Sequence, residues 1–299
     1  MHDSVGRGAP GQNGQYPSVP FVALDTLWFQ VAGTLCNLKC THCFISCSPT
    51  NHSHEMLTLE EVRERLREAI PLGVREYYFT GGEPFMAPDI LAMIEESLRQ
   101  GPVSVLTNGL LLTPERCRKL KTISDASEYS FDVRISIDGY TAEVNDPIRG
   151  AGTFEKILAG IHNLAAAGLN PVVTVTEACG DAASAEGSAK FLDWMRSIGL
   201  SRPRLKILSL FRIGAEEQRL RAYESWESLR GRALTAEEAE KLQCSSCRMV
   251  TSRGVYVCPI LIDEPQARMG DRIAETLRPF ELRYNACFTC HEYGVTCRT

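Results

Sequence analysis

The 299-residue chain is long enough for one large α/β domain with a small appendage, and its 44% hydrophobic residues can build a full core. A formal net charge of −5 gives no sign of the basic surface that nucleic-acid binding needs. The sequence also lacks an apolar run of the roughly eighteen residues that a membrane helix requires. We therefore expect neither a nucleic-acid partner nor a membrane span.

The chain begins with a stretch rich in Gly and Pro, Met1–Pro20, which lacks the apolar core of a secretion signal. We expect this stretch to be a disordered leader and the protein to be cytoplasmic. Twelve cysteines in a reducing compartment favour metal or redox chemistry over disulfides. Four of them lie within residues 36–47 and six within residues 244–297, so only Cys117 and Cys179 stand apart.

Between the two cysteine groups, short apolar runs alternate with helical patterns. The candidate strands are Leu27–Gly33, Arg75–Thr80, Val103–Thr107, Asp132–Ile137, Pro171–Thr176 and Leu205–Leu210. A capping box at Thr58–Glu61 predicts the first helix, and apolar periodicity predicts helices over Asp89–Arg99 and around Phe191–Ile198. Thr153 is the expected cap of a further helix, Phe154–Ala167.

Strand–helix units in series predict parallel strands with right-handed crossovers. An open doubly wound sheet and a partial barrel both satisfy this pattern, and both place functional residues at the carboxyl ends of the strands. The notable loops follow the first four strands: the first cysteine loop, Gly81–Pro84, Asn108 and Asp138–Gly139. Their convergence on one edge predicts a single site.

The first cysteine loop has the spacing C-x3-C-x2-C, formed by Cys36, Cys40 and Cys43. Three thiolates can hold a cubane iron–sulfur cluster and leave one iron open, as a catalytic metal requires. The alternative is a structural zinc site, completed by Cys47 or by one of the nearby histidines, His42, His52 or His54.

This loop, with the aromatic His42 inside it, resembles that of the radical S-adenosylmethionine (SAM) superfamily, and Gly81-Gly82-Glu83-Pro84 is similar to the glycine-rich motif of that family. The resemblance implies a partial (β/α)6 barrel over residues 21–235. It implies a 4Fe–4S cluster on the three cysteines and SAM bound at the open iron. Reductive cleavage of SAM would give a 5′-deoxyadenosyl radical, with the electron from a flavodoxin or ferredoxin-type donor.

The resemblance also implies a set of SAM-binding residues in the cysteine loop and at the strand ends. These are His42, Gly81, Gly82, Glu83, Pro84, Asn108, Ser136, Asp138 and Arg149. The glycines permit close backbone approach to a ligand, and the Arg149 guanidinium can pair with a carboxylate. Taken singly, each of these residues also suits an ordinary turn or a solvated surface.

The C-terminal cysteines resemble the auxiliary-cluster extensions called SPASM and twitch domains, which implies a small cysteine-rich extension over residues 236–299 with a second 4Fe–4S cluster. The candidate ligands are Cys244, Cys247, Cys258, Cys287, Cys290 and Cys297. Four thiolates close one cubane, which favours one auxiliary cluster and two spare cysteines over two incomplete clusters. The sequence leaves open which four bind, and a zinc ribbon is the alternative. Gly254-Val-Tyr-Val is expected to form a hairpin strand, with Gly254 in the turn.

The resemblance implies an oxidoreductase or maturase that abstracts hydrogen from a peptide or small-molecule substrate. Cys179 could return a hydrogen atom to a substrate radical, although a packed thiol is the ordinary role for such a residue. Two other classes of protein remain open at this stage: an iron–sulfur electron-transfer protein and a zinc-binding interaction module.

Overall fold

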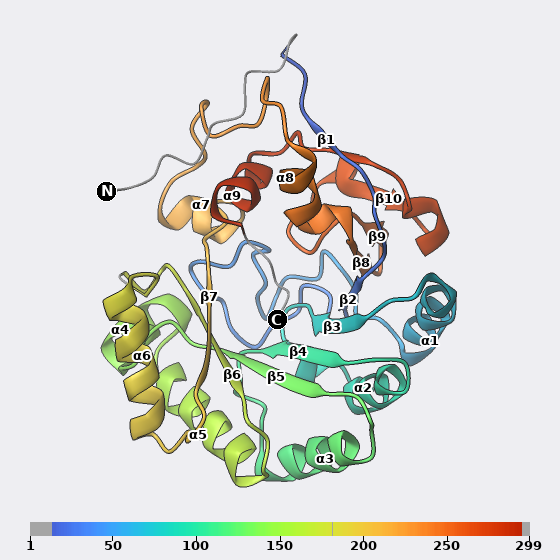
Figure 1. Ribbon diagram of the computed structural model, residues 1–299. Coiled ribbons are helices and arrows are strands. Elements are labelled where there is room, and N and C mark those ends of the chain that lie inside the picture. Colours follow the sequence, from blue (N-terminus) through green and yellow to red (C-terminus); the bar gives the residue numbers. More distant parts are fainter. Residues whose placement is uncertain (1–13, 181, 295–299) are drawn as a thin grey trace.

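A computed structural model describes residues 14–180 and 182–294 of the chain (Figure 1). In these residues one curved sheet has the strand order β10-β9-β8-β2-β3-β4-β5-β6-β7. The six strands expected from the sequence are all present and mutually parallel, which confirms the partial (β/α)6 barrel. They are β2 (Thr26–Gln30), β3 (Glu76–Thr80), β4 (Val103–Thr107), β5 (Phe131–Ser136), β6 (Val172–Thr176) and β7 (Arg204–Leu208).

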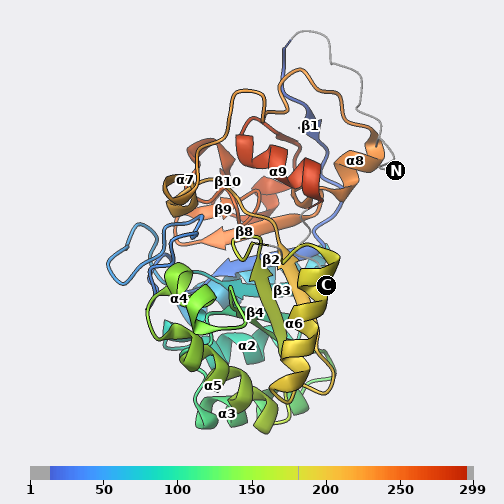
Figure 2. The same cartoon turned by 90° about the vertical axis from the view of Figure 1, so that its left-hand side faces the viewer.

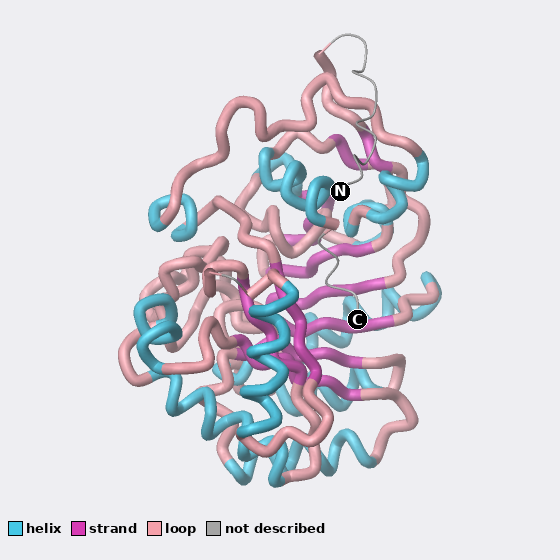
Figure 3. Tube along the Cα trace, turned by 60° about the vertical axis from the view of Figure 1, so that its left-hand side comes forward, coloured by secondary structure: helices cyan, strands magenta, loops and turns pink. Residues whose placement is uncertain are grey.

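Helices cover the outer face of this sheet (Figures 1 and 3). They are α1 (Leu59–Ala69), α2 (Ile90–Leu98), α3 (Pro114–Asp125), α4 (Ala142–Arg149), α5 (Thr153–Ala166) and α6 (Ala185–Ser197). The predicted capping box is confirmed, because the Thr58 hydroxyl accepts from the Glu61 N–H and the Glu61 carboxylate accepts from the Thr58 N–H. Thr153 is the first residue of α5 instead of its cap, since Gly152 takes the cap position with φ +70°.

Side chains alternate between two hydrophobic clusters along the barrel strands, as the period of a strand requires. Leu27, Phe29 and Tyr77 pack with the outer helices in the larger cluster. Trp28 and Tyr78 point to the other side and stack with ring centroids 4.3 Å apart. The even-numbered residues of these barrel strands therefore line the concave side of the sheet, where the site described below lies.

The cysteine-rich C-terminal part continues the barrel sheet. Strand β8 (Cys247–Thr251) pairs in parallel with β2, and β9 (Gly254–Tyr256) and β10 (Arg268–Gly270) extend the sheet antiparallel. Gly254 pairs with Thr251 at the β8–β9 turn, which confirms the expected hairpin. The short helices of this part are α7 (Ala215–Arg219), α8 (Ala236–Lys241) and α9 (Asn285–Tyr293). Figure 2 shows the whole part stacked against the barrel on the side of β2.

One end of the expected leader is ordered. Strand β1 (Ser18–Val19) pairs antiparallel with β11 (Phe280–Glu281), and Val19 is fully buried in the second cluster. The prediction of disorder was wrong for this segment, because an apolar side chain and two paired strand residues anchor it. Residues 1–13 lie outside the described residues. No helix within the described ranges is long and apolar enough to cross a membrane.

Arg248 on β8 is fully buried and ties the C-terminal part together. Its guanidinium donates to the carbonyls of Thr276 and Cys244, at 2.7 and 2.9 Å, and lies 4.6 Å from the centre of the Phe21 ring. A buried cation is tolerated only when its donors are satisfied in this way. Arg248 thus fixes the backbone at Cys244, one of the candidate ligands.

Candidate functional site

The first cysteine loop is closed at its base by backbone pairing. Leu35 and Ser48 form an isolated parallel bridge, and the Cys36 N–H donates to the Ser48 carbonyl at 3.1 Å. The four cysteines of residues 36–47 therefore sit on one closed loop at the carboxyl end of β2. All four line the same cavity, of about 220 Å³.

This cavity lies at the carboxyl ends of the barrel strands, where the sequence predicted a site. Of the residues expected to bind SAM, six line it: His42, Gly81, Gly82, Asn108, Ser136 and Arg149. They come from the cysteine loop, the loops after β3 and β4, the end of β5 and helix α4. The structure thus brings most of the expected SAM-binding residues together with Cys36, Cys40 and Cys43.

The thiols of this loop are set up for a metal centre. Burial raises the pKa of Cys36 to about 12, and that of Cys40 to about 11 despite the nearby Arg149 charge. A hydrogen bond from Cys47 lowers the pKa of Cys43 to about 6. Buried thiolates need a compensating positive centre, and a metal cluster supplies one. Among the described Cys, His, Asp and Glu side chains, no group of three or more is arranged to hold a single metal ion.

The Gly81–Pro84 segment needs its two glycines because its backbone packs directly against the backbone at Ala32 and Leu35. A Cβ atom on Gly82 would lie 1.9 Å from the Leu35 carbonyl oxygen, and one on Gly81, where φ is +145°, would lie 2.9 Å from the Ala32 nitrogen. The Gly82 and Glu83 N–H groups donate to the carbonyls of Gly33 and Leu35, at 2.8 and 3.0 Å. This segment therefore braces the cysteine loop as well as lining the cavity.

Glu83 does not reach the cavity. Its fully buried carboxylate accepts hydrogen bonds from the Thr107 hydroxyl at 2.7 Å, the Asn108 N–H at 2.8 Å and the Phe85 N–H at 3.1 Å. Burial raises its pKa, and these three donors act against that rise. Glu83 is not among the residues that line the cavity, and we propose that it positions the end of β4 through its donors.

Asp138 is also buried behind the cavity wall. It lies 2.5 Å from His42 Nε2 and 2.7 Å from Arg149 Nε, and it accepts from the Thr176 hydroxyl at 2.6 Å. Burial opposes ionisation, but the Arg149 charge and His42 together hold the pKa of Asp138 well below its usual range. Asp138 is thus an anchor for two cavity residues and does not itself line the cavity.

Two further expected site residues do not line the cavity. Cys179 packs in the larger hydrophobic cluster and does not line the cavity, so the proposed return of a hydrogen atom has no geometric support. Pro84 is buried and begins a short 3-10 helix, Pro84–Met86, outside the cavity. Both residues follow a strand end, where sequence position does not determine which way a side chain points.

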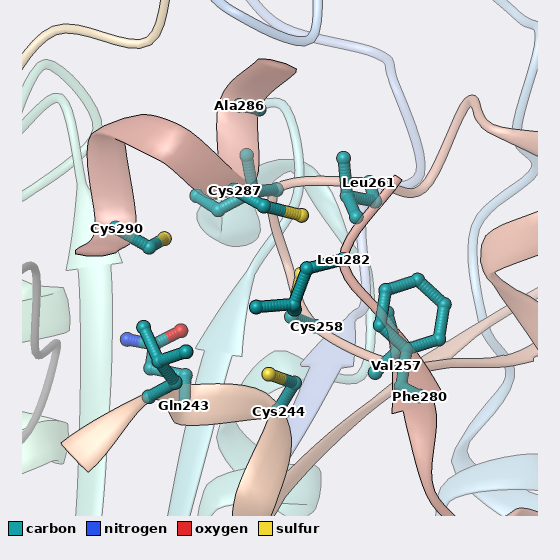
Figure 4. A pocket seen from close by; sticks show the side chains of 12 residues that line it. Gln243, Cys244, Val257, Cys258, Leu261, Phe280, Leu282, Ala286, Cys287 and Cys290 are labelled. Carbon is teal, nitrogen blue, oxygen red and sulfur yellow. The ribbon is translucent and has the colours of Figure 1, made fainter. Parts of the chain in front are cut away.

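The C-terminal cysteines form a second, smaller cavity of about 20 Å³. Four of them line it, Cys244, Cys258, Cys287 and Cys290, and Figure 4 shows their side chains converging from three separate segments. Cys247 lies instead on β8, where its thiol donates to the Val257 carbonyl at 3.6 Å. The inclusion of Cys247 among the expected ligands is therefore not supported. Cys297 lies outside the described residues.

Sequence reasoning missed one side of the large cavity. This side is formed by the last residue of β7, the residues that follow it, and the residues after Cys258, with Thr174 from β6: Leu208, Ser209, Leu210, Phe211, Pro259 and Ile260. The apolar run after Leu205 indicated a strand and nothing more. Its continuation past the strand end, Leu210-Phe211, was the available signal.

Comparisons with known proteins agree with this geometry. The profile of the radical SAM superfamily matches residues 31–180, which is just over half of the chain. The chain belongs to the radical SAM superfamily, as the cysteine loop and the Gly81–Pro84 segment indicated.

Among curated proteins, mycofactocin maturase MftC of Mycobacterium tuberculosis is 37% identical over 134 residues, which cover 44% of this chain and 32% of that protein. The AdoMet-dependent heme synthase of Methanosarcina barkeri is 37% identical over 139 residues, covering 46% and 38%. The matches thus span about a third of the length of these curated relatives.

Two solved structures share the fold. Native anSMEcpe with bound AdoMet has a TM-score of 0.60 at 18% identity, over 84% of this chain and 79% of that chain. Streptococcus suis SuiB bound to S-adenosylmethionine has a TM-score of 0.62 at 14% identity, over 83% and 63%. At these identities the likeness concerns the fold alone.

We predict that Glu83→Gln destabilises the protein by roughly 2 kcal/mol, since one amide NH2 must then face a buried N–H or hydroxyl donor. Glu95→Gln, on the exposed face of α2, is the matched control and should change stability little. Denaturant unfolding of the two variants measures the difference. Equal stabilities would show that the buried carboxylate does not hold the strand ends.

Proposed function

We propose that this chain is a radical SAM enzyme that cleaves SAM reductively and abstracts hydrogen from a peptide or small-molecule substrate. The observation that carries the proposal is the shared cavity: the cysteines of the C-x3-C-x2-C loop and six expected SAM-binding residues line one space. An electron-transfer protein would need a cluster but no adjoining cavity lined by these polar residues.

Cys36, Cys40 and Cys43 would hold the 4Fe–4S cluster, leaving one iron without a protein ligand. The reduced cluster with SAM supplies a 5′-deoxyadenosyl radical. The protein's own residues bind and orient. Arg149 is placed to meet a carboxylate while Asp138 holds its guanidinium, and the Asn108 amide lies 3.7 Å from the Cys36 sulfur and donates to Asn37.

We also propose that Cys244, Cys258, Cys287 and Cys290 hold a second 4Fe–4S cluster. Burial raises the pKa of Cys244 to about 12 and that of Cys287 well above its usual value, so these thiols too need a positive centre to ionise. Ile260 lines both cavities, and this shared residue supports a second site close to the first. A cluster there can accept an electron from a substrate radical or bind the substrate.

We predict that the anaerobically reconstituted protein with dithionite converts SAM into 5′-deoxyadenosine and methionine. Cys40→Ala should lower this activity by ~100-fold or more, because the cluster loses a thiolate ligand. Cys117→Ala is the matched control, since Cys117 is buried on α3 outside both cavities. The yield of 5′-deoxyadenosine from each variant is measured by chromatography. Equal yields from Cys40→Ala and Cys117→Ala would contradict the proposal that the cysteine loop holds the cluster that cleaves SAM.

The iron content should be about eight per chain, from two cubanes of four irons each. Cys258→Ala should lose about four of these irons yet keep cleavage of SAM, because the first site lies in the barrel loop. Cys247→Ala should retain all of them, since its thiol faces Val257. Iron, zinc and acid-labile sulfide are measured on the same samples. Zinc bound at the C-terminal cysteines in place of iron would instead indicate a structural zinc ribbon.

A further inference from the structure

The second cysteine cavity contains one polar side chain besides its cysteines. Among the described residues that line it, this side chain is the carboxamide of Gln243, and the others are aliphatic or phenylalanine. Gln243 is only 8% exposed, so a strongly polar group is buried against an apolar lining. An amide in such a place is unfavourable unless it has a hydrogen-bond partner.

The amide oxygen of Gln243 has no such partner within the protein. Its Oε1 atom is buried and accepts no hydrogen bond from any described residue. In Figure 4 this oxygen lies on the side of Cys244, and the amide nitrogen lies on the opposite side. The buried cation of this part, Arg248, does not supply a donor, because its N–H groups donate to the backbone carbonyls of Thr276, Cys244 and Cys247.

The backbone that carries Gln243 is held in place. Gln243 begins a short 3-10 helix, Gln243–Ser245, and the Ser245 carbonyl accepts from the Val22 N–H at 2.8 Å. The next residue, Cys244, is itself a proposed ligand, and its carbonyl is held by Arg248. The Gln243 side chain therefore starts from a fixed position beside the second site.

A bound 4Fe–4S cluster changes what this amide faces. The thiolate and sulfide sulfurs of the cluster accept hydrogen bonds and donate none. A carbonyl oxygen directed at them would meet only negative charge, whereas an amide N–H would pair with them. A half-turn about the last side-chain bond exchanges the two ends of the amide and leaves the rest of Gln243 where it is.

We propose that the Gln243 carboxamide donates an N–H hydrogen bond to a sulfur of the second 4Fe–4S cluster and thereby raises the reduction potential of that cluster. This inference rests on the proposed function, which assigns the cluster to the four cysteines of this cavity. Hydrogen bonds to the sulfurs are among the factors that set the potential of such clusters. A donor stabilises the reduced state more, because that state carries one additional negative charge.

A raised potential suits the second cluster to the role of electron acceptor. Four thiolates close all four of its irons, which leaves none for a substrate to bind. In this role the substrate radical loses one electron to the cluster and one proton to water. The electron then leaves the cluster for a flavodoxin- or ferredoxin-type protein.

Gln243→Met tests the inference, because methionine keeps the length of the side chain and has no N–H donor. We expect the midpoint potential of the second cluster to fall by about 59 mV, which corresponds to a tenfold change in a one-electron equilibrium. Gln100→Met, the same substitution at an exposed position just after α2, should leave the potential unchanged. Redox titration of the intact protein is followed by electron paramagnetic resonance, and the signal that Cys258→Ala lacks identifies the second cluster.

A second measurement detects the hydrogen bond itself. Electron–nuclear double resonance of the reduced protein, prepared in H2O and in D2O, should show an exchangeable proton coupled to the second cluster. This coupling should be lost in Gln243→Met and remain in Gln100→Met. Iron content is determined on the same samples, and Gln243→Met should keep about eight irons per chain.

The outcomes separate this inference from the proposed function. Equal potentials and equal proton couplings in the two variants, at unchanged iron content, would overturn the hydrogen bond and leave the second cluster standing. Loss of about four irons in Gln243→Met alone would also overturn it, because Gln243 would then be needed to hold the cluster instead of donating to it. Absence of a second cluster from the intact protein would contradict the proposed function and the inference together.

Discussion

The buried carboxylate of Glu83 is the constraint on which the site depends. The carboxylate accepts three hydrogen bonds, two of them from donors at the end of β4. The backbone N–H of Glu83 donates to the carbonyl of Leu35 at the base of the cysteine loop. Three loops at the carboxyl edge of the sheet are therefore joined through one residue. A buried carboxyl group without partners is very unfavourable, so the loops cannot separate without exposing or orphaning this group.

The same constraint explains the glycines beside it. Backbone-to-backbone contact at Gly82 leaves no room for a side chain, and the contact brings the cavity floor against Leu35 and Cys36. Backbone packing thus helps to fix the position of the cysteine loop. In our proposal this preorganisation fixes the open side of the cluster toward Asn108 and Arg149, where SAM would bind.

Both cysteine sites share one hydrophobic cluster. Cys36, Cys258 and Cys287 are buried within it, and Ile260 separates the two cavities. In our proposal, this apolar surrounding keeps water from a reactive radical and makes each site depend on a bound cluster for charge balance. Since β8 extends the barrel sheet, the second site is held at a defined distance from the first instead of on a flexible appendage.

Much of this architecture was predictable from local patterns. The six barrel strands are short apolar runs, and Thr58 marks a helix start by its own chemistry, so neither depends on distant contacts. The cysteine loop was predictable because the C-x3-C-x2-C spacing lets one short loop bring three thiolates around a single cluster. Strand β1 was missed because its stability comes from pairing with Phe280–Glu281, far along the chain.

The direction of individual side chains was the part that sequence could not determine. Glu83, Asp138 and Asn108 all follow strand ends, yet only Asn108 lines the cavity. The two carboxylates are fully buried and are not among the lining residues. Likewise, spacing alone does not distinguish Cys247 from its neighbour Cys244. Its place on β8 turns it toward Val257, and only tertiary packing decides that.

Electron paramagnetic resonance of the dithionite-reduced protein, recorded before and after addition of SAM, tests the central claim most directly. If one iron of the barrel cluster is open to the cavity, SAM should change the shape of the cluster signal. The same change should persist in Cys258→Ala and vanish when Cys36, Cys40 and Cys43 are replaced together. A reduced spectrum that SAM leaves unchanged in the intact protein would contradict the account.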